Sequence, residues 1–152
     1  MKTINNFITE KLRINKNIKI NQYNYHPKDK DELKELIEQL IKERGNKADL
    51  NDIDTSEITD MSMLFWKSKF NGNISEWDVS NVKDMDNMFC RSKFNGNISE
   101  WNISKVKNMT GLFYKSKFNG DISKWDVSNV EDMRYMFAGS PLEKNPPKWY
   151  KE

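Results

Sequence analysis

The sequence predicts an α/β repeat solenoid, in which short parallel strands and short helices stack behind an N-terminal helical cap. The first observation is a six-residue run, Phe-Asn-Gly-(Asn/Asp)-Ile-Ser, that returns every 24 residues, at Phe70, Phe94 and Phe118. The second is a tryptophan that keeps the same interval, at Trp77, Trp101 and Trp125. A period of roughly 20 to 50 residues is typical of stacked repeats, because one unit cannot bury its apolar face without a neighbouring copy.

Aligned on this interval, residues 46–141 contain four repeats of 24 residues, and residues 142–152 contain a truncated fifth repeat. The fifth is recognised by Trp149, which falls one interval after Trp125. The segment before the repeats, residues 1–45, shares none of this pattern. We therefore predict one domain in three parts: an N-terminal cap, four repeats and a C-terminal cap formed by the fifth repeat.

Two patterns predict a strand and then a helix within each repeat. Trp77 and Val79 alternate with charged residues, and a period of two is typical of a half-buried strand. Met85, Met88 and Phe89 have the spacing of a helical face. The residue before that face is suited to capping a first helical turn in every repeat, at Asp60, Asp84, Asn108 and Asp132. Three Asn-Gly pairs, at residues 71–72, 95–96 and 119–120, then predict turns with positive φ before the next strand.

Stacked parallel strands would align the tryptophans in one column. Because neighbouring strands lie about 4.8 Å apart, the indole rings would pack on one another inside the repeats. We expect Trp77, Trp101 and Trp125 to form this buried column, with Ile53 and Trp149 at its two ends.

The N-terminal cap is predicted to contain helices over residues 3–13 and 29–44, with a possible strand over residues 18–25. The second helix has Gly45 as its stop and an apolar stripe formed by Leu33, Leu36, Ile37, Leu40 and Ile41. That stripe needs a surface to cover, and the exposed end of the repeats is the nearest one. We therefore expect this helix to pack on the first repeat.

Two segments resemble a known family: residues 58–65 (Ile-Thr-Asp-Met-Ser-Met-Leu-Phe) and residues 77–89 (Trp-Asp-Val-Ser-Asn-Val-Lys-Asp-Met-Asp-Asn-Met-Phe). They resemble the repeat of the BspA-like leucine-rich-repeat proteins, especially the mycoplasma-type domain of unknown function 285. The resemblance covers about residues 46–141 and implies a right-handed, leucine-rich-repeat-like stack. Members of that family are commonly surface or secreted proteins linked to adhesion, and the family offers no catalytic residues to transfer.

Composition favours a cytoplasmic protein without disulfides. The 25 basic and 23 acidic residues leave a net charge of +2, so no global field attracts the chain to nucleic acid or to an anionic membrane. Cys90 is the only cysteine, which excludes an internal disulfide. The N-terminus lacks the apolar run of a signal peptide, and no stretch has the roughly 18 apolar residues of a membrane span. A secreted or surface location would need a signal upstream of this chain.

The sequence contains no motif that predicts an enzyme, a metal site or a cofactor. A Cys90–His26 catalytic pair is disfavoured, because the two residues belong to different structural units. The acidic run over residues 49–60 faintly resembles a calcium loop, but it lacks the glycine and the final glutamate of that motif. We therefore expect no catalytic, metal-binding or cofactor-binding residues.

Two surfaces are candidates for binding a partner. Basic residues recur after each predicted helix beside Trp66 and Tyr114, at Lys67, Lys69, Arg91, Lys93, Lys115 and Lys117. Such a row of cations with aromatic rings is able to follow a phosphate backbone, although a row of charges is more often a solvated face. The second surface consists of positions at which the repeats differ, where recognition has freedom to vary. The predicted partner-binding residues are Trp66, Lys67, Arg91, Tyr114, Lys115, Arg134, Tyr135 and Tyr150.

Three functional hypotheses follow from these features. The first is a non-catalytic protein–protein interaction module. The second is a small cytosolic inhibitor of a nucleoprotein enzyme, encoded by a mobile element, that acts by binding protein or nucleic acid. The third is a surface adhesin-type repeat protein. A protein partner is favoured over nucleic acid, no membrane contact is expected, and the sequence leaves the oligomeric state open.

Overall fold

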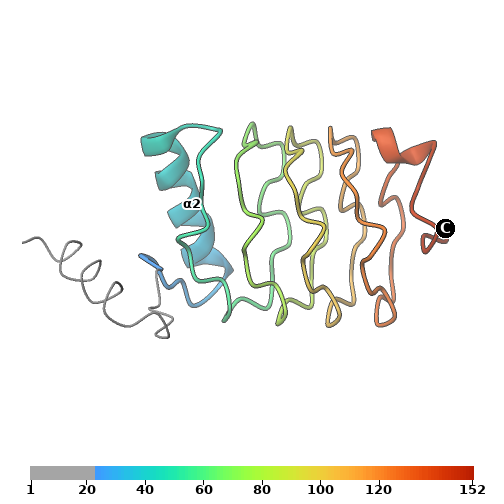
Figure 1. Ribbon diagram of the computed structural model, residues 1–152, viewed down its shortest axis with the longest axis horizontal. Helices are drawn as coiled ribbons and strands as arrows, with labels where there is room; N and C mark the ends of the chain where they lie inside the picture. Colours follow the sequence, from blue (N-terminus) through green and yellow to red (C-terminus); the bar gives the residue numbers. More distant parts are fainter. Residues whose placement is uncertain (1–22) are drawn as a thin grey trace, which may run out of the picture.

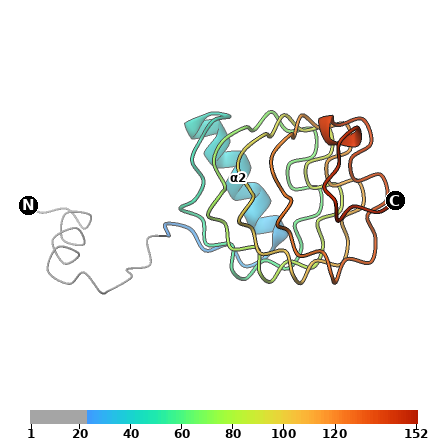
Figure 2. The same cartoon turned by 45° about the vertical axis from the view of Figure 1, so that its right-hand side comes forward.

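The computed structural model describes residues 23–152. The repeats follow one another as coils that lie side by side along the long axis, and helix α2 (Lys30–Arg44) lies across the N-terminal end (Figure 1). A short 3-10 helix, η1 (Pro141–Glu143), lies near the opposite end. Turning the molecule by 45° shows that each coil is an open loop of backbone around the interior of the stack (Figure 2).

The predicted fold class, an α/β repeat solenoid of parallel strands and short helices, is wrong. Within residues 23–152 the repeats contain no regular strand, no sheet and no α-helix other than α2. Neighbouring coils are joined instead by isolated parallel bridges, of which the row Asp60, Asp84, Asn108 and Asp132 is the longest. The repeat interval was correctly recognised, but the secondary structure assigned inside it was not.

The predicted repeat helices are successive tight turns. The amide of Leu64 donates to Met61 O (3.3 Å) and that of Ser68 to Phe65 O (3.0 Å), which are bonds to the third preceding residue rather than the fourth. Met63 and Lys67, the third residues of these two turns, have φ of 57° and 54°. A residue with positive φ cannot continue a right-handed helix, so no helix forms in this part of the repeat.

The predicted strands are short links between two turns. The amide of Trp77 bonds Ile74 O (3.2 Å) and the amide of Val82 bonds Val79 O (3.0 Å). Ile74, Trp77, Val79 and Val82 are all buried, so the buried positions are spaced by three, two and three residues. This spacing fits neither a strand nor a helix over its whole length. The alternation of Trp77 and Val79, which predicted a strand, is only the middle step of this spacing.

Side-chain oxygens stabilise the corners of each coil. Asp84 Oδ1 accepts a hydrogen bond from the amide of Asp86 (2.8 Å), and Asp78 Oδ1 accepts one from Ser80 (3.0 Å). Asn97 Oδ1 bonds the amide of Ser99 in the same way (3.0 Å). These are Asx turns, which use the same residue types as a helix N-cap but require no helix to follow. The predicted capping residues therefore cap turns.

Alternate backbone amides join each coil to the next. In the first coil, Met61, Met63 and Phe65 donate to carbonyls 23 residues further along the chain, over 2.9, 2.8 and 2.9 Å. The same pattern recurs between later coils, as in the bond from Met85 to Asn108 O (2.9 Å). The result is a ladder of hydrogen bonds along the stack although the segments are too irregular to form a sheet.

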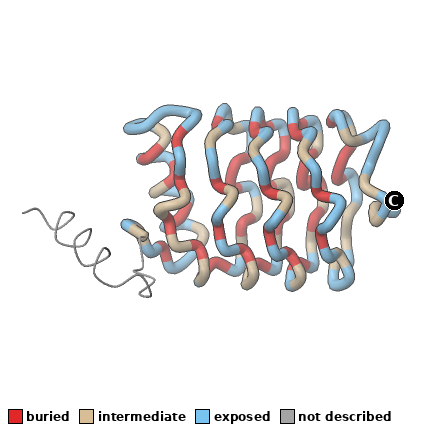
Figure 3. The backbone as a smooth tube through the Cα atoms, viewed as in Figure 1, coloured by how far each residue is buried: buried red, intermediate tan, exposed pale blue. Residues whose placement is uncertain are grey.

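The core consists of aromatic columns that run through the coils. Trp77, Trp101 and Trp125 are each 4% exposed, which confirms that they are buried, and Ile53 is 1% exposed. Each of the three indoles lies against a phenylalanine ring, as Trp101 does against Phe89 (6.3 Å), and the tryptophans that stack on one another are Trp125 and Trp149 (6.4 Å). Each indole Nε1 donates to a carbonyl 27 residues earlier, as in the bond from Trp101 to Ile74 O (3.2 Å). Phenylalanine rings stack beside them at centroid distances of 5.5 to 6.0 Å, in the column Phe65, Phe89, Phe113 and Phe137. Figure 3 shows the buried residues recurring at matching places in successive coils.

The prediction that the Asn-Gly pairs have positive φ is wrong. The described glycines with positive φ are Gly45, Gly111 and Gly139. Gly96 serves a different purpose, because a Cβ at this position would lie 2.7 Å from the ring of Phe94. Glycine is therefore needed there for close packing against the ring of Phe94, not for its backbone freedom.

The helix predicted over residues 29–44 is confirmed as α2. Asp29 caps it by accepting a hydrogen bond from the amide of Glu32, and the amide of Gly45 donates to Ile41 O at its other end. Leu33, Ile37 and Leu40 are buried, and they belong to the same core cluster as the first coil. The predicted helix over residues 3–13 and most of the possible strand over residues 18–25 lie outside the described residues. The division into cap, repeats and C-terminal cap stays a prediction.

Candidate functional site

The predicted basic residues lie in two adjacent rows along the stack. We call the set Lys67, Lys69, Arg91, Lys93, Lys115 and Lys117 the basic ridge. The amides of Lys67, Arg91 and Lys115 donate to the next coil over 2.9, 2.7 and 2.8 Å, which holds these three residues one above another. All three have φ between 51° and 56°. The same backbone conformation therefore presents a cation at the same corner of three coils.

The cations of the basic ridge lack acidic partners among residues 23–152. The ion pairs formed by the described residues involve His26, Lys30, Arg44 and Arg134, and none involves the ridge. All six ridge residues are exposed. Although the chain is nearly neutral overall, this corner of the coils is a concentrated positive patch.

The aromatic residues beside the ridge differ in exposure. Trp66 is 44% exposed, and Lys67 Nζ lies 4.3 Å from the centroid of its ring. Tyr114 is half-buried, with Lys115 Nζ 5.3 Å from its ring centroid. Cys90 occupies the same position in the coil between them and is buried; burial raises the pKa of its thiol, which disfavours a reactive thiolate.

Met63 is a surface residue that was not among the predicted binding residues. It is 44% exposed and lines a groove of about 480 Å³ between α2 and the first coil. Trp66 lines the same groove, together with Lys30 and Lys34 of α2. The signal available in the sequence was the repeat position that Met63 shares with Tyr135, where a large apolar residue is not required for packing.

The predicted residues at the C-terminal end are not one cluster of free anchors. Tyr135 is 67% exposed with φ of 58°. Arg134 is bound to Asp132, with Nη2 2.7 Å from Oδ2, and this pairing lowers the pKa of the carboxyl. Tyr150 packs edge-on against Phe137, with ring centroids 4.8 Å apart, and so helps to seal the core. Only Tyr135 of the three projects freely.

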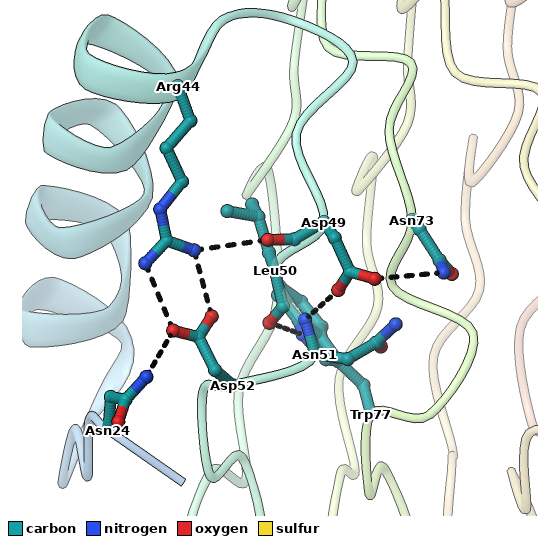
Figure 4. Close-up of polar contacts among 8 residues, drawn as sticks. All are labelled: Asn24, Arg44, Asp49, Leu50, Asn51, Asp52, Asn73 and Trp77. Atoms are coloured by element: carbon teal, nitrogen blue, oxygen red, sulfur yellow. Dashed lines mark hydrogen bonds and ion pairs between the residues drawn. The ribbon is translucent and has the colours of Figure 1, made fainter. Parts of the chain in front are cut away.

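The acidic run over residues 49–60 is used to hold the cap. Arg44 forms two hydrogen bonds with Asp52, over 2.9 and 3.0 Å, and a third with Asp49 O over 3.1 Å (Figure 4). Asn24 Nδ2 donates to Asp52 as well, over 2.9 Å. The hydrogen bonds from Arg44 lower the pKa of Asp52. Asp49, by contrast, caps the amide of Asn51 (2.8 Å), so the carboxylates point to separate partners.

The described residues show no arrangement typical of a catalytic or metal site. His26 Nδ1 lies 3.2 Å from Asp54 Oδ2 of the first coil, at an exposed position, whereas Cys90 is buried in the second coil. No three His, Cys, Asp or Glu side chains of residues 23–152 are grouped so that they might hold a metal ion together. In the same part of the chain, no helix combines the length and the apolar character needed to cross a membrane. The cytoplasmic location stays a prediction.

Comparison with known proteins gives one match. A family model described as "Mycoplasma protein of unknown function, DUF285" covers residues 32–149. No curated protein and no solved structure matches the chain. The BspA-like leucine-rich-repeat part of the resemblance has no support in this match. Because the matched segment extends from α2 to the tryptophan of the fifth repeat and so covers well over half of the sequence, the chain belongs to the mycoplasma family DUF285.

Proposed function

We propose that the chain is a non-catalytic protein-binding module, and that its contact surface consists of the basic ridge together with Met63 and Trp66. The observation that carries this proposal is the row of six exposed cations without a carboxylate within ion-pair distance among residues 23–152. Charges that are left unpaired along a rigid row favour an acidic partner, because the pairing then forms on association without breaking an internal ion pair.

Apolar surface beside the ridge supplies the second requirement of a protein interface. Met63 and Trp66, both 44% exposed, lie at the start of the ridge and line the same groove. Tryptophan is among the residues that contribute most to binding energy when an interface buries them, and methionine adapts to irregular partners. A polar rim around an apolar centre is the arrangement expected of a specific contact.

Backbone conformation at Met63 is set by the repeat. Its φ of 57° is close to the 60° of Gly111, which occupies the same position two coils later. A residue with a side chain is disfavoured in this region by roughly 1 kcal/mol or more, whereas glycine is not. The same conformation recurs at Asn87 and Tyr135, and the hydrogen bond from the amide of Met63 to Asp86 O (2.8 Å) holds it at Met63. The conformation therefore belongs to the repeat, and exposure alone distinguishes Met63.

The proposal is tested by comparing two charge-reversal variants in capture experiments with lysate of the native host. The first carries Lys67→Glu, Arg91→Glu and Lys115→Glu. The matched control carries Lys83→Glu, Lys107→Glu and Lys124→Glu, which change the net charge equally at exposed positions away from the ridge. We expect the wild type and the control to retain the same protein and the ridge variant to lose it.

Nuclease treatment separates a protein partner from nucleic acid. Trp66 beside a cation is also able to stack on an unpaired base, so nucleic acid is the competing occupant of this surface. Retention of the protein after nuclease digestion supports the module. Equal capture by both charge variants, or loss of the partner on nuclease treatment, would contradict it.

A further inference from the structure

The last coil has backbone amides whose equivalents in the earlier coils donate to the following coil. In the third repeat, Met109 and Gly111 donate to the carbonyls of Asp132 and Arg134, over 2.8 and 2.9 Å. One interval later, the equivalent amides belong to Met133 and Tyr135, and no residue within 23–152 accepts from them. The next amide of the same row, that of Phe137, also has no acceptor within these residues, although its equivalent Phe113 donates to Met136 O (2.9 Å). The amide of Gly139, which follows in the row, donates to the carboxylate of Glu143 over 3.2 Å. The carboxylate of Glu143 therefore takes, at one position of this row, the role that a carbonyl of the following coil has in earlier coils.

The carbonyl groups of the same segment determine where the edge is able to accept a hydrogen bond. The oxygens of Met133 and Tyr135 are used inside turns, where they accept from Met136 (3.1 Å) and Ala138 (3.4 Å). The oxygen of Glu131 differs from them. Its equivalent in the preceding coil, Lys107 O, accepts from the amides of both Glu131 and Asp132, whereas no amide within the described residues bonds Glu131 O. The edge thus offers one acceptor followed by donors at alternate residues.

Apolar side chains accompany this edge. Val127, Val130 and Met133 are partly exposed, whereas their equivalents one and two coils earlier are fully buried. They line a groove of about 490 Å³, and Trp149 forms part of its lining. The groove is therefore apolar beneath and polar along its backbone edge, which is the combination that suits a peptide bound along a backbone edge.

We propose that this edge binds a segment of a partner protein that follows the backbone course of residues 107–111, donates an amide to Glu131 O, accepts from the amides of Met133 and Tyr135, and places apolar side chains over Val127 and Val130. The contact between residues 107–111 and residues 83–87 is the template for this arrangement. There the amide of Lys107 donates to Lys83 O, and the amides of Met85 and Asn87 donate to the carbonyls of residues 108 and 110. A second copy of the same edge is a poor occupant, because donors would face donors. The site is separate from the basic ridge and does not depend on it.

The probe is a synthetic peptide of residues 106–116, Val-Lys-Asn-Met-Thr-Gly-Leu-Phe-Tyr-Lys-Ser, which reproduces the template segment. It is added at about 1 mM to the full chain, and amide hydrogen exchange is followed by NMR. We expect exchange at Met133 and Tyr135 to slow by about tenfold or more, while amides exposed elsewhere are unchanged. Absence of protection at these two amides overturns the proposal.

Two methylated peptides provide the matched control without altering the protein. N-methylation at the residue equivalent to Lys107 removes the donor that would bond Glu131 O, and we expect it to abolish the protection. N-methylation at the residue equivalent to Met109 removes an amide that points to the opposite side of the template, toward Asp132 O, and protection should remain. Equal effects of the two methyl groups would overturn the proposed register. Protection that rises with protein concentration in the absence of peptide would also overturn it, because a second copy would then be the occupant.

Discussion

The N-terminal end of the stack is covered by a helix and has one paired backbone segment, whereas the C-terminal end has neither closure in full. At the N-terminal end, α2 buries its apolar stripe beside the first coil, where Leu50 is fully buried. Backbone groups of residues 52–54 are paired there as well, because the amide of Asn24 donates to Asp52 O (2.9 Å) and that of Asp54 to Tyr25 O (2.9 Å). The carbonyls of Asp60, Ser62 and Leu64 accept from no backbone amide within residues 23–152, although their equivalents in the next coil do. At the C-terminal end, Trp149 covers Trp125, but the amides of Met133 and Tyr135 have no partner among the described residues.

This difference teaches that a coil end needs two separate closures, one for apolar side chains and one for backbone hydrogen bonds. A helix provides the first, because its apolar face covers the side chains of the coil. It cannot provide the second, since all its own amides beyond the first turn are bonded internally. The short segment Asn24–Tyr25 does so at the N-terminal end by a single parallel bridge to Ile53. Nothing equivalent within residues 23–152 serves residues 131–135.

The largest expected effect separates the middle of the tryptophan column from its end. Trp101→Ala should lower the free energy of unfolding by about 3–5 kcal/mol, because it leaves a cavity and removes the donor to Ile74 O. Trp149→Ala should cost less than half as much, since Trp149 is only half-buried. Urea unfolding of both variants measures the two values. Equal losses would mean that the C-terminal end is packed as tightly as the centre.

The next comparison uses the same chemical change at both ends. Leu40→Ala in α2 should destabilise the protein by about 2–5 kcal/mol, because Leu40 is fully buried. Leu142→Ala in η1, where the side chain is half-buried, should cost roughly 1 kcal/mol. Thermal unfolding monitored by circular dichroism gives the order. A larger loss for Leu142→Ala would reverse the assignment of the better-closed end.

A smaller effect, dependent on pH, concerns the polar contacts of the N-terminal end. Asp52→Asn should lower stability at pH 7 by about 1–3 kcal/mol, because Arg44 would lose its charged partner. The pKa of Asp52 is lowered in the folded protein, so its contribution is complete above the unfolded value of roughly 3.9 and is lost as pH falls through the folded value. The difference between wild type and variant should therefore shrink below about pH 4. A difference that is constant between pH 7 and pH 3 would contradict this account.

The smallest effect is expected at the start of α2. Asp29→Ala removes the bond to the amide of Glu32 (2.9 Å) and should cost about 1 kcal/mol. Asp29→Asn keeps an acceptor and is the matched control, with most of the stability retained. Denaturant unfolding of both variants checks this expectation. If the alanine variant is as stable as the wild type, α2 is held by its apolar face alone.

What the sequence predicted correctly depended on signals that act locally or repeat strictly. Helix α2 was found because Asp29 and Gly45 mark its ends and its apolar stripe is regular. The tryptophan column was found because an invariant interval leaves one consistent place for a large ring. Both inferences need no knowledge of the backbone between the marked positions.

The inside of the repeat was assigned wrongly because different structures share its signals. Asp84 before an apolar face is equally suited to a helix cap and to an Asx turn. The positive φ at Asn87 and Arg91 decides between them. Neither asparagine nor arginine indicates that conformation as strongly as glycine does. The open edge at Met133 was not predicted, because pairing between coils depends on the direction of each amide. Met63 was missed because methionine elsewhere in the repeats is core.

The ladder between coils restricts how the length of this chain is able to change. Its forward bonds join residues 23 apart, the bridges between repeats join residues 24 apart and the indole bonds join residues 27 apart, so each contact joins a coil to its neighbour. Removing residues 94–117 would bring Lys93 to Phe118 and leave every remaining position opposite an equivalent neighbour. Removing one residue more would shift each later amide away from its acceptor. Insertions and deletions should therefore be tolerated in whole coils, so that evolution and protein engineering alike must lengthen the stack in steps of 24 residues.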